Sequence, residues 1–193
     1  TTPYPLVVFL HGNHGTCGQG SLPRKDFGRM YSYYGTCPGG YNIVVPNHEG
    51  YAYLADQLAS WGYVVVSINS NRGINPLDGP TTSDPALIAA RGKLALRHLQ
   101  LWRAWNTTGA LPSDPTFPYS TETKGFNGAQ FLGKIDFSNV GLMGHSRGGE
   151  GVRDAYNRYR SGAANNPWPN RIPNMTIKAI FEMAAELKGI SVD

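Results

Sequence analysis

Four short apolar runs divide the chain and predict β-strands. The first covers residues 4–10 and is apolar throughout, and the others lie at residues 63–68, 139–143 and 177–183. Runs of this length are typical of strands in a parallel sheet whose two faces are both covered. Residues 106–136, in contrast, are rich in Pro, Gly, Ser and Thr and show no periodicity, which predicts a surface loop or a small insertion.

Helical periodicity separates these strands. Residues 50–61 carry apolar side chains at helical spacing, and Gly62 follows where such a helix would end. A longer helix is predicted to begin at Asp84, which can cap it, with Pro85 in its first turn. A third helix is predicted over residues 147–160. This alternation predicts βαβ units and an α/β fold, a three-layer αβα sandwich with a mainly parallel sheet.

The composition fits a single folded domain over residues 1–193. Hydrophobic residues make up 40% of the chain and charged residues 16%, which argues against a disordered protein. No apolar run approaches the ~20 residues of a transmembrane helix, so we expect no membrane span. The 17 Lys and Arg residues give a net charge of +4 but are scattered, whereas nucleic-acid binding needs them clustered. We therefore expect no nucleic-acid partner.

Two cysteines, Cys17 and Cys37, each lie in a polar, Gly-rich loop. An even number of loop cysteines about twenty residues apart predicts one disulfide, which would stabilise the fold by roughly 3 kcal/mol in the chain-entropy model. A disulfide implies an oxidising compartment, so we expect a secreted or periplasmic protein. The alternative is two unrelated free thiols in a cytosolic protein. The first residues lack the charged and apolar regions of a signal peptide, and we expect a mature or trimmed product.

The segment Gly144-His145-Ser146-Arg147-Gly148 matches the pattern G-x-S-x-G and lies between a predicted strand and a predicted helix. In this context the serine sits on a sharp turn, and the two glycines leave room for the backbone around it. The serine hydroxyl would then project above the sheet as a nucleophile. The alternative is a plain tight turn, because the pattern is common by chance in a glycine-rich chain.

A second group of residues, His11-Gly12-Asn13-His14-Gly15, ends the first predicted strand. Enzymes with a serine on such a turn place one backbone N–H of this loop toward the oxyanion, and the other comes from the residue after the serine. The expected oxyanion donors are therefore the backbone N–H groups of Asn13 and Arg147. We expect His11 and His145 to fix loops or to pack, rather than to transfer protons.

Three sequences in this order, VVFLHG, GYVVVSIN and VGLMGHSRGG, resemble the α/β-hydrolase superfamily. Their spacing is similar to the branch of secreted esterases with cutinase-like polyester hydrolases, dienelactone-hydrolase-like enzymes and platelet-activating-factor acetylhydrolase-like enzymes. The resemblance covers most of the chain. It implies that the four strands are the family's third to sixth, in the spatial order 4-3-5-6. It also implies hydrolysis of carboxylic esters through an acyl-enzyme formed on Ser146.

The chain departs from the family after Ser146. The family places its acid and its histidine beyond the serine, but none of the five histidines follows His145, so the sequence does not name the general base. The loop residues His14 and His48 are alternatives for that role. Carboxylates that follow the serine are Glu150, Asp154, Glu182, Glu186 and Asp193. We expect Glu150 and Glu182 to be structural.

The family's last strands also have no counterpart in the chain. An uncovered apolar edge strand favours aggregation, so the natural fold should continue beyond the fourth strand. We expect an α/β-hydrolase core that is incomplete at its C-terminus and lacks the triad acid and histidine. Either a second polypeptide segment completes the fold, or the chain is a truncated or nicked product.

The leading hypothesis is a serine esterase that acts on a small-molecule or polymeric ester and needs its acid and histidine from outside the segment. The alternative is a non-catalytic binding module, or an inactive fragment, that keeps the hydrolase scaffold. A third, weaker idea is an aromatic rim for an apolar polymer or carbohydrate, formed by Tyr31, Tyr33, Tyr34, Tyr41, Tyr51 and Tyr53.

No metal site and no cofactor are expected. The His, Cys, Asp and Glu residues do not show the spacing of metal ligands, and the Gly-rich segments lack a phosphate-binding pattern.

Overall fold

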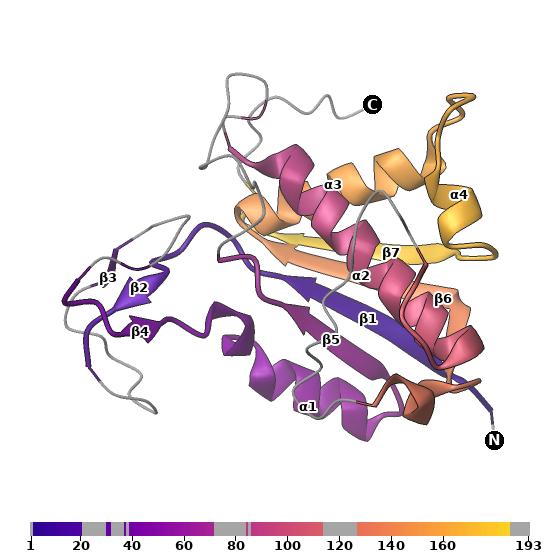
Figure 1. Cartoon of the computed structure of the whole chain (residues 1–193), viewed down its shortest axis with the longest axis horizontal. Coiled ribbons are helices and arrows are strands. Elements are labelled where there is room, and N and C mark those ends of the chain that lie inside the picture. The colour runs from indigo at the N-terminus through magenta and orange to yellow at the C-terminus, as the bar shows by residue number, and fades with distance from the viewer. Residues whose placement is uncertain are drawn as a thin grey trace.

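A parallel sheet of four strands forms the centre of the computed structural model, which describes residues 2–20, 30–31, 37, 39–71, 84, 86–113 and 127–185 (Figure 1). The strands lie in the order β5 (Val64–Ile68), β1 (Tyr4–Leu10), β6 (Ile135–His145) and β7 (Ile177–Met183), and each neighbouring pair is parallel. The four predicted strands and the expected spatial order are thus confirmed, and so is the α/β class.

Helices cover both faces of this sheet. Tyr51, just before α1 (Ala52–Ser60), makes an edge contact with Phe9 of β1, with ring centroids 6.3 Å apart. The alternate β1 side chains point to the other face, where Leu10 is buried in one core cluster with Leu96 and Leu99 of α2 (Ile88–Thr108). Helix α3 (Arg147–Arg160) packs beside α2 on that face.

Among the described residues there are also three shorter helical elements: η1 (Asn47–Glu49), η2 (Gly128–Phe131) and α4 (Trp168–Arg171). Within the described ranges, no helix combines the length and the apolar character needed to cross a bilayer.

Strand β6 is longer than the sequence predicted. It begins at Ile135, in the stretch expected to be a loop, and Tyr4 pairs with Ile135 before a register shift leads to the pair Leu6–Val140. Ile135 and Phe137 are buried while the residue between them is more exposed. This alternation is a strand pattern, but it is too short to be distinguished from the polar segment before it.

The start of α2 also differs from the prediction. The helix begins at Ile88 rather than near Asp84, because the buried Leu87 adopts the left-handed conformation (φ 57°). The Asp84 carboxylate still accepts hydrogen bonds from the backbone N–H groups of Ala89 and Ala90, at 3.1 and 2.9 Å. The Asp84 side chain therefore binds the first turn of the helix, but the N-cap residue is Leu87 and not Asp84 as predicted, because an unpredicted turn separates Asp84 from the helix. Pro85 lies outside the described residues.

A small antiparallel sheet follows β1 along the chain. It has the order β3 (Met30–Tyr31), β2 (Cys17–Gly18) and β4 (Ile43–Val44), and it lies beyond the carboxyl ends of β1 and β5 (Figure 1). Strands of two residues leave no readable pattern, and the sequence did not predict them. The predicted disulfide between Cys17 and Cys37 is confirmed, and it ties this sheet to the chain 20 residues further on.

Glycines allow the turn after β6 to press against the end of β1. A Cβ atom on Gly148 would overlap the carbonyl oxygen of Leu10, and one on Gly144 would overlap the carbonyl oxygen of Gly148. Neither obstacle is a flexible side chain, so the backbone itself would have to move. The two glycines predicted to leave room around Ser146 are therefore required by close packing.

We expect Gly148→Ala to lower the free energy of unfolding by about 3 kcal/mol, because the added methyl group overpacks rigid backbone. Urea unfolding monitored by circular dichroism would measure the loss. Gly162→Ala is the matched control, because a Cβ there meets open space, and its effect should stay within about 0.5 kcal/mol. Equal stability of the two variants would contradict the packing argument.

Candidate active site

Ser146 occupies the junction between β6 and α3 in a strained backbone conformation. Its φ is 54° and its ψ is −129°, a region that residues other than glycine rarely adopt. Such strain costs on the order of 1–3 kcal/mol and persists only where the surroundings fix it. Here the Ser146 N–H donates to the Met183 carbonyl oxygen at 2.9 Å, and its carbonyl oxygen accepts from the Gly149 N–H at 2.8 Å.

The loop after β1 passes directly against this turn. A Cβ atom on Gly12 would lie 2.8 Å from the Ser146 Cβ and 2.7 Å from the His145 carbonyl oxygen. Only glycine fits so close an approach. The register of the sheet produces this contact, because Leu10 pairs with Gly144 and the two strands end together.

The two predicted oxyanion donors lie on either side of this contact. Asn13 follows Gly12 and is exposed, and Arg147 is the first residue of α3, where the helix supplies no acceptor for the N–H groups. Among the residues that the structure describes, neither backbone N–H has a hydrogen-bond acceptor. The fold therefore brings the chain positions of Ser146, Asn13 and Arg147 to one edge of the sheet.

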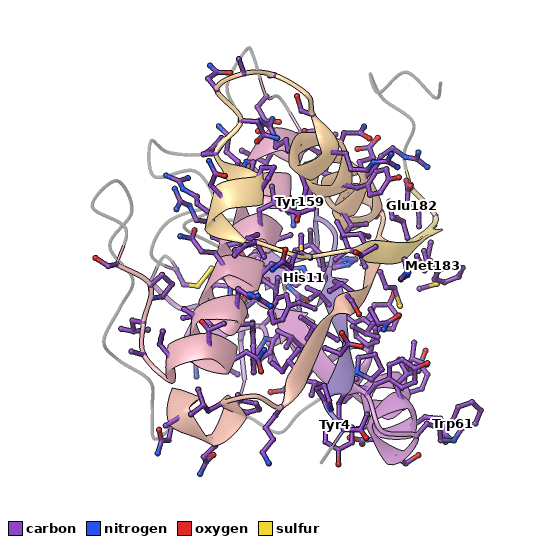
Figure 2. The ribbon with its side chains drawn as sticks, turned by 90° about the vertical axis from the view of Figure 1, so that its right-hand side faces the viewer. Tyr4, His11, Trp61, Tyr159, Glu182 and Met183 are labelled. Carbon is purple, nitrogen blue, oxygen red and sulfur yellow. A yellow bond between two sulfur atoms is a disulfide. The ribbon has the colours of Figure 1, made fainter. Side chains whose placement is uncertain are left out.

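His11 fixes the start of this loop. Its Nε2 accepts a hydrogen bond from the Ser70 backbone N–H at 2.9 Å, so its Nδ1 carries the proton and donates to the Gly12 carbonyl oxygen at 2.8 Å. Figure 2 shows its side chain in the interior of the molecule. Burial lowers the pKa of His11 to about 4, and the Arg91 charge adds to this effect. His11 is thus a neutral structural residue, as expected.

A buried arginine donates a hydrogen bond to the backbone of His11. Arg91 of α2 is only 2% exposed, and its Nη1 donates to the His11 carbonyl oxygen at 3.0 Å and to the Ser70 Oγ at 2.5 Å. Arg91 was not predicted from the sequence. The signal was present, because Arg91 stands three residues after Ile88 and four before Ala95, on the apolar face of the helix.

Two asparagines join the loops at the carboxyl edge of the sheet. Asn47 Nδ2 donates to the Gly15 carbonyl oxygen at 2.9 Å and to the Asn71 Oδ1 at 2.7 Å. Asn71 Nδ2 in turn donates to the Val45 carbonyl oxygen at 2.5 Å. These contacts connect segments that follow β1, β4 and β5, and no short sequence pattern could have indicated them.

Neither histidine considered as an alternative base is bonded to the serine. The structure gives the Ser146 hydroxyl no hydrogen bond to any residue that it describes. The His14 ring stacks on His145, and His48 lies in η1, with its Nε2 3.9 Å from a Glu49 carboxylate oxygen.

The carboxylates after Ser146 have other surroundings. Glu182 of β7 forms an ion pair with Arg153 of α3, which agrees with its expected structural role, and Figure 2 shows it at the carboxyl end of β7. Glu150 is buried on α3. Glu186 and Asp193 lie outside the described residues.

The predicted aromatic rim is described only in part. The rings of Tyr51 and Tyr53 lie 6.4 Å apart, and Tyr53 is exposed, while Tyr41 is half-buried. The side chains of Tyr31, Tyr33 and Tyr34 lie outside the described residues.

No model of a known protein family matches the chain, and no curated protein sequence matches it either. Within the described ranges, no group of three or more His, Cys, Asp or Glu side chains is placed to hold a metal ion.

We expect the free energy of unfolding to decrease as the pH is lowered, because His11 takes up a proton more readily in the unfolded chain. Its pKa in the folded state is about 4 and its ordinary value is 6.5, so the unfolded chain takes up the proton first. The contribution of the neutral ring to the free energy of unfolding is fully present above pH 6.5. About 3 kcal/mol of this free energy is lost as the pH falls to 4. Urea unfolding across this range would measure the loss.

His11→Gln should lower stability at pH 7 and reduce its change between pH 6.5 and 4. Ser161→Ala, at an exposed position that carries no titratable group, is the control and should leave the pH dependence as it is. An unchanged pH dependence in His11→Gln would contradict the assignment.

Proposed function

We propose that the chain is the core of an α/β-hydrolase-type serine hydrolase that acts on carboxylic esters. One observation carries the proposal: Ser146 has a positive φ at a strand-to-helix turn, and Gly12 lies against it. A backbone that is strained in this way, at the end of a central strand, is characteristic of a nucleophile turn. The strand order β5-β1-β6-β7 supports the same superfamily.

In the proposed reaction, the Ser146 Oγ attacks the ester carbonyl carbon while a base takes the hydroxyl proton. The carbonyl oxygen becomes negatively charged and accepts hydrogen bonds from the backbone N–H groups of Asn13 and Arg147. Each such donor is worth roughly 3 to 4 kcal/mol of transition-state stabilisation in a dry site. The alcohol then leaves, and water hydrolyses the acyl-enzyme.

No described residue is assigned as the base in this proposal. All five histidines of the chain are described, and none bonds to the Ser146 hydroxyl. The resemblance to α/β-hydrolases implies an acid and a histidine that follow later strands of the family's sheet. The disulfide Cys17–Cys37 supports a secreted or periplasmic location.

Covalent labelling tests the proposal directly. A fluorophosphonate should react with Ser146 in the complete protein, and Ser146→Ala should abolish the adduct and lower ester turnover by at least about a thousandfold. Ser161→Ala, at the exposed opposite end of α3, is the matched control and should label normally. Mass spectrometry of the digested protein would locate the adduct. The absence of any adduct under conditions that label a control esterase would overturn the proposal.

The second candidate is a non-catalytic module on the hydrolase scaffold. It is favoured by one observation, that the Ser146 hydroxyl is bonded to no described base. Ester turnover that is lost in Ser146→Ala would exclude it. A complete protein that shows neither turnover nor an adduct would support it.

A further inference from the structure

A row of aromatic rings leads away from the proposed nucleophile. His145, the last residue of β6, precedes Ser146, and its ring centroid lies 6.3 Å from that of Tyr51, with 61° between the ring planes. The Tyr51 centroid in turn lies 6.4 Å from that of Tyr53, at an angle of 51°. The row therefore begins beside Ser146 and ends on Tyr53, which is 71% exposed.

The inner tyrosine of this row is packed against the sheet. Tyr51 is half-buried at the start of α1, and the ring of Phe9 from β1 contacts it in an edge arrangement, at 77°. Burial raises the pKa of Tyr51, and the neighbouring Tyr53 adds to this effect, so the ring is uncharged at neutral pH. Because Phe9 and His145 both contact it, Tyr51 is a fixed support for the exposed ring of Tyr53.

The surface around the row suits an uncharged aromatic ligand. Residues 50–55 contain no charged side chain. The ring spacing and the tilted planes of the row are those that aromatic rings prefer, because the edge of one ring is attracted to the face of the next. A ligand ring placed on Tyr53 would continue the row in the same geometry. A saturated ring of similar size lacks the π-system and gains only the burial of apolar area.

We propose that Tyr51 and Tyr53 are specificity-determining residues, which bind an uncharged aromatic group in the acid or the alcohol part of the ester. The inference rests on the proposed function, because it names the substrate class of the same site. Since the row begins at the residue before Ser146, a ring joined to the bound ester by a short chain reaches it. The row contributes binding and no proton transfer, so its loss should raise KM more than it lowers kcat.

The test compares esters of the complete protein that differ only in the saturation of one ring. Methyl 3-phenylpropanoate and methyl 3-cyclohexylpropanoate carry the ring in the acid. A second pair, 2-phenylethyl acetate and 2-cyclohexylethyl acetate, carries it in the alcohol. In at least one pair, kcat/KM should be about fivefold higher for the aromatic ester, which is the size of effect expected from one aromatic contact.

Variants of Tyr53 connect this ratio to the row. Tyr53→Leu keeps an apolar side chain without the ring, and should bring the ratio close to one, mainly through a higher KM for the aromatic ester. Tyr53→Phe keeps the ring and should retain the ratio. Circular dichroism would show whether each variant is folded.

Trp61→Leu is the matched control. Trp61 is 74% exposed at the other end of α1, so the change removes a similarly exposed aromatic ring from the same helix. Figure 2 shows its side chain pointing into solvent, well separated from Met183, whose carbonyl oxygen binds the Ser146 N–H. The ratio should therefore stay at the wild-type value in Trp61→Leu.

Three results would overturn the inference while a fluorophosphonate still labels Ser146. They are a ratio near one in both pairs of esters, a wild-type ratio in Tyr53→Leu, and an equal loss of the ratio in Trp61→Leu. If Tyr53→Leu does not fold, the ratio in Tyr53→Gln decides in the same way. A wild-type protein that is neither labelled nor active on any ester would overturn the proposed function, and the inference with it, and differs from the other results because every substrate fails.

Discussion

The close approach of two turns at the carboxyl edge of the sheet is the constraint on which the rest of the structure depends. One turn follows β1 at Gly12, and the other follows β6 at Ser146, with no room between them for a further methyl group. The parallel register of β1 and β6 makes both strands end at the same level. The positive φ of Ser146 then directs the chain from the strand into α3 within one residue.

A framework of buried polar side chains holds the first turn. Arg91 binds the His11 carbonyl oxygen, and His11 itself joins the Gly12 carbonyl oxygen to the Ser70 N–H. Buried polar groups of this kind are costly unless they are satisfied, and when satisfied they favour a single arrangement of the backbone. The framework therefore fixes the turn at Gly12, and burial within it keeps the His11 ring neutral.

The sequence was informative where the chain repeats a simple physical pattern. Apolar runs predicted the four strands, and the Gly-x-Ser-x-Gly segment predicted the turn at Ser146, because a close approach of backbones demands glycine. The loop cysteines predicted the disulfide that joins Cys17 and Cys37.

The remaining features depend on contacts between distant residues, which local patterns do not contain. Arg91 reaches His11 across 80 positions, and His14 meets His145 across 131. Leu87 has a left-handed backbone conformation and α2 begins only after it, but leucine is not a residue type that predicts a turn. The small sheet around β2 is formed by strands of two residues, too short to produce a period. The Ser146 hydroxyl has no hydrogen bond to a described residue, so these contacts do not indicate a base.

The proposed active site requires that the Ser146 hydroxyl face the backbone N–H groups of Asn13 and Arg147. A crystal structure of the complete protein with a phosphonate bound to Ser146 would test it most directly. We expect one phosphonate oxygen within about 3 Å of both N–H groups. An adduct whose oxygens point away from these groups, with Asn13 and Arg147 hydrogen-bonded elsewhere, would contradict it.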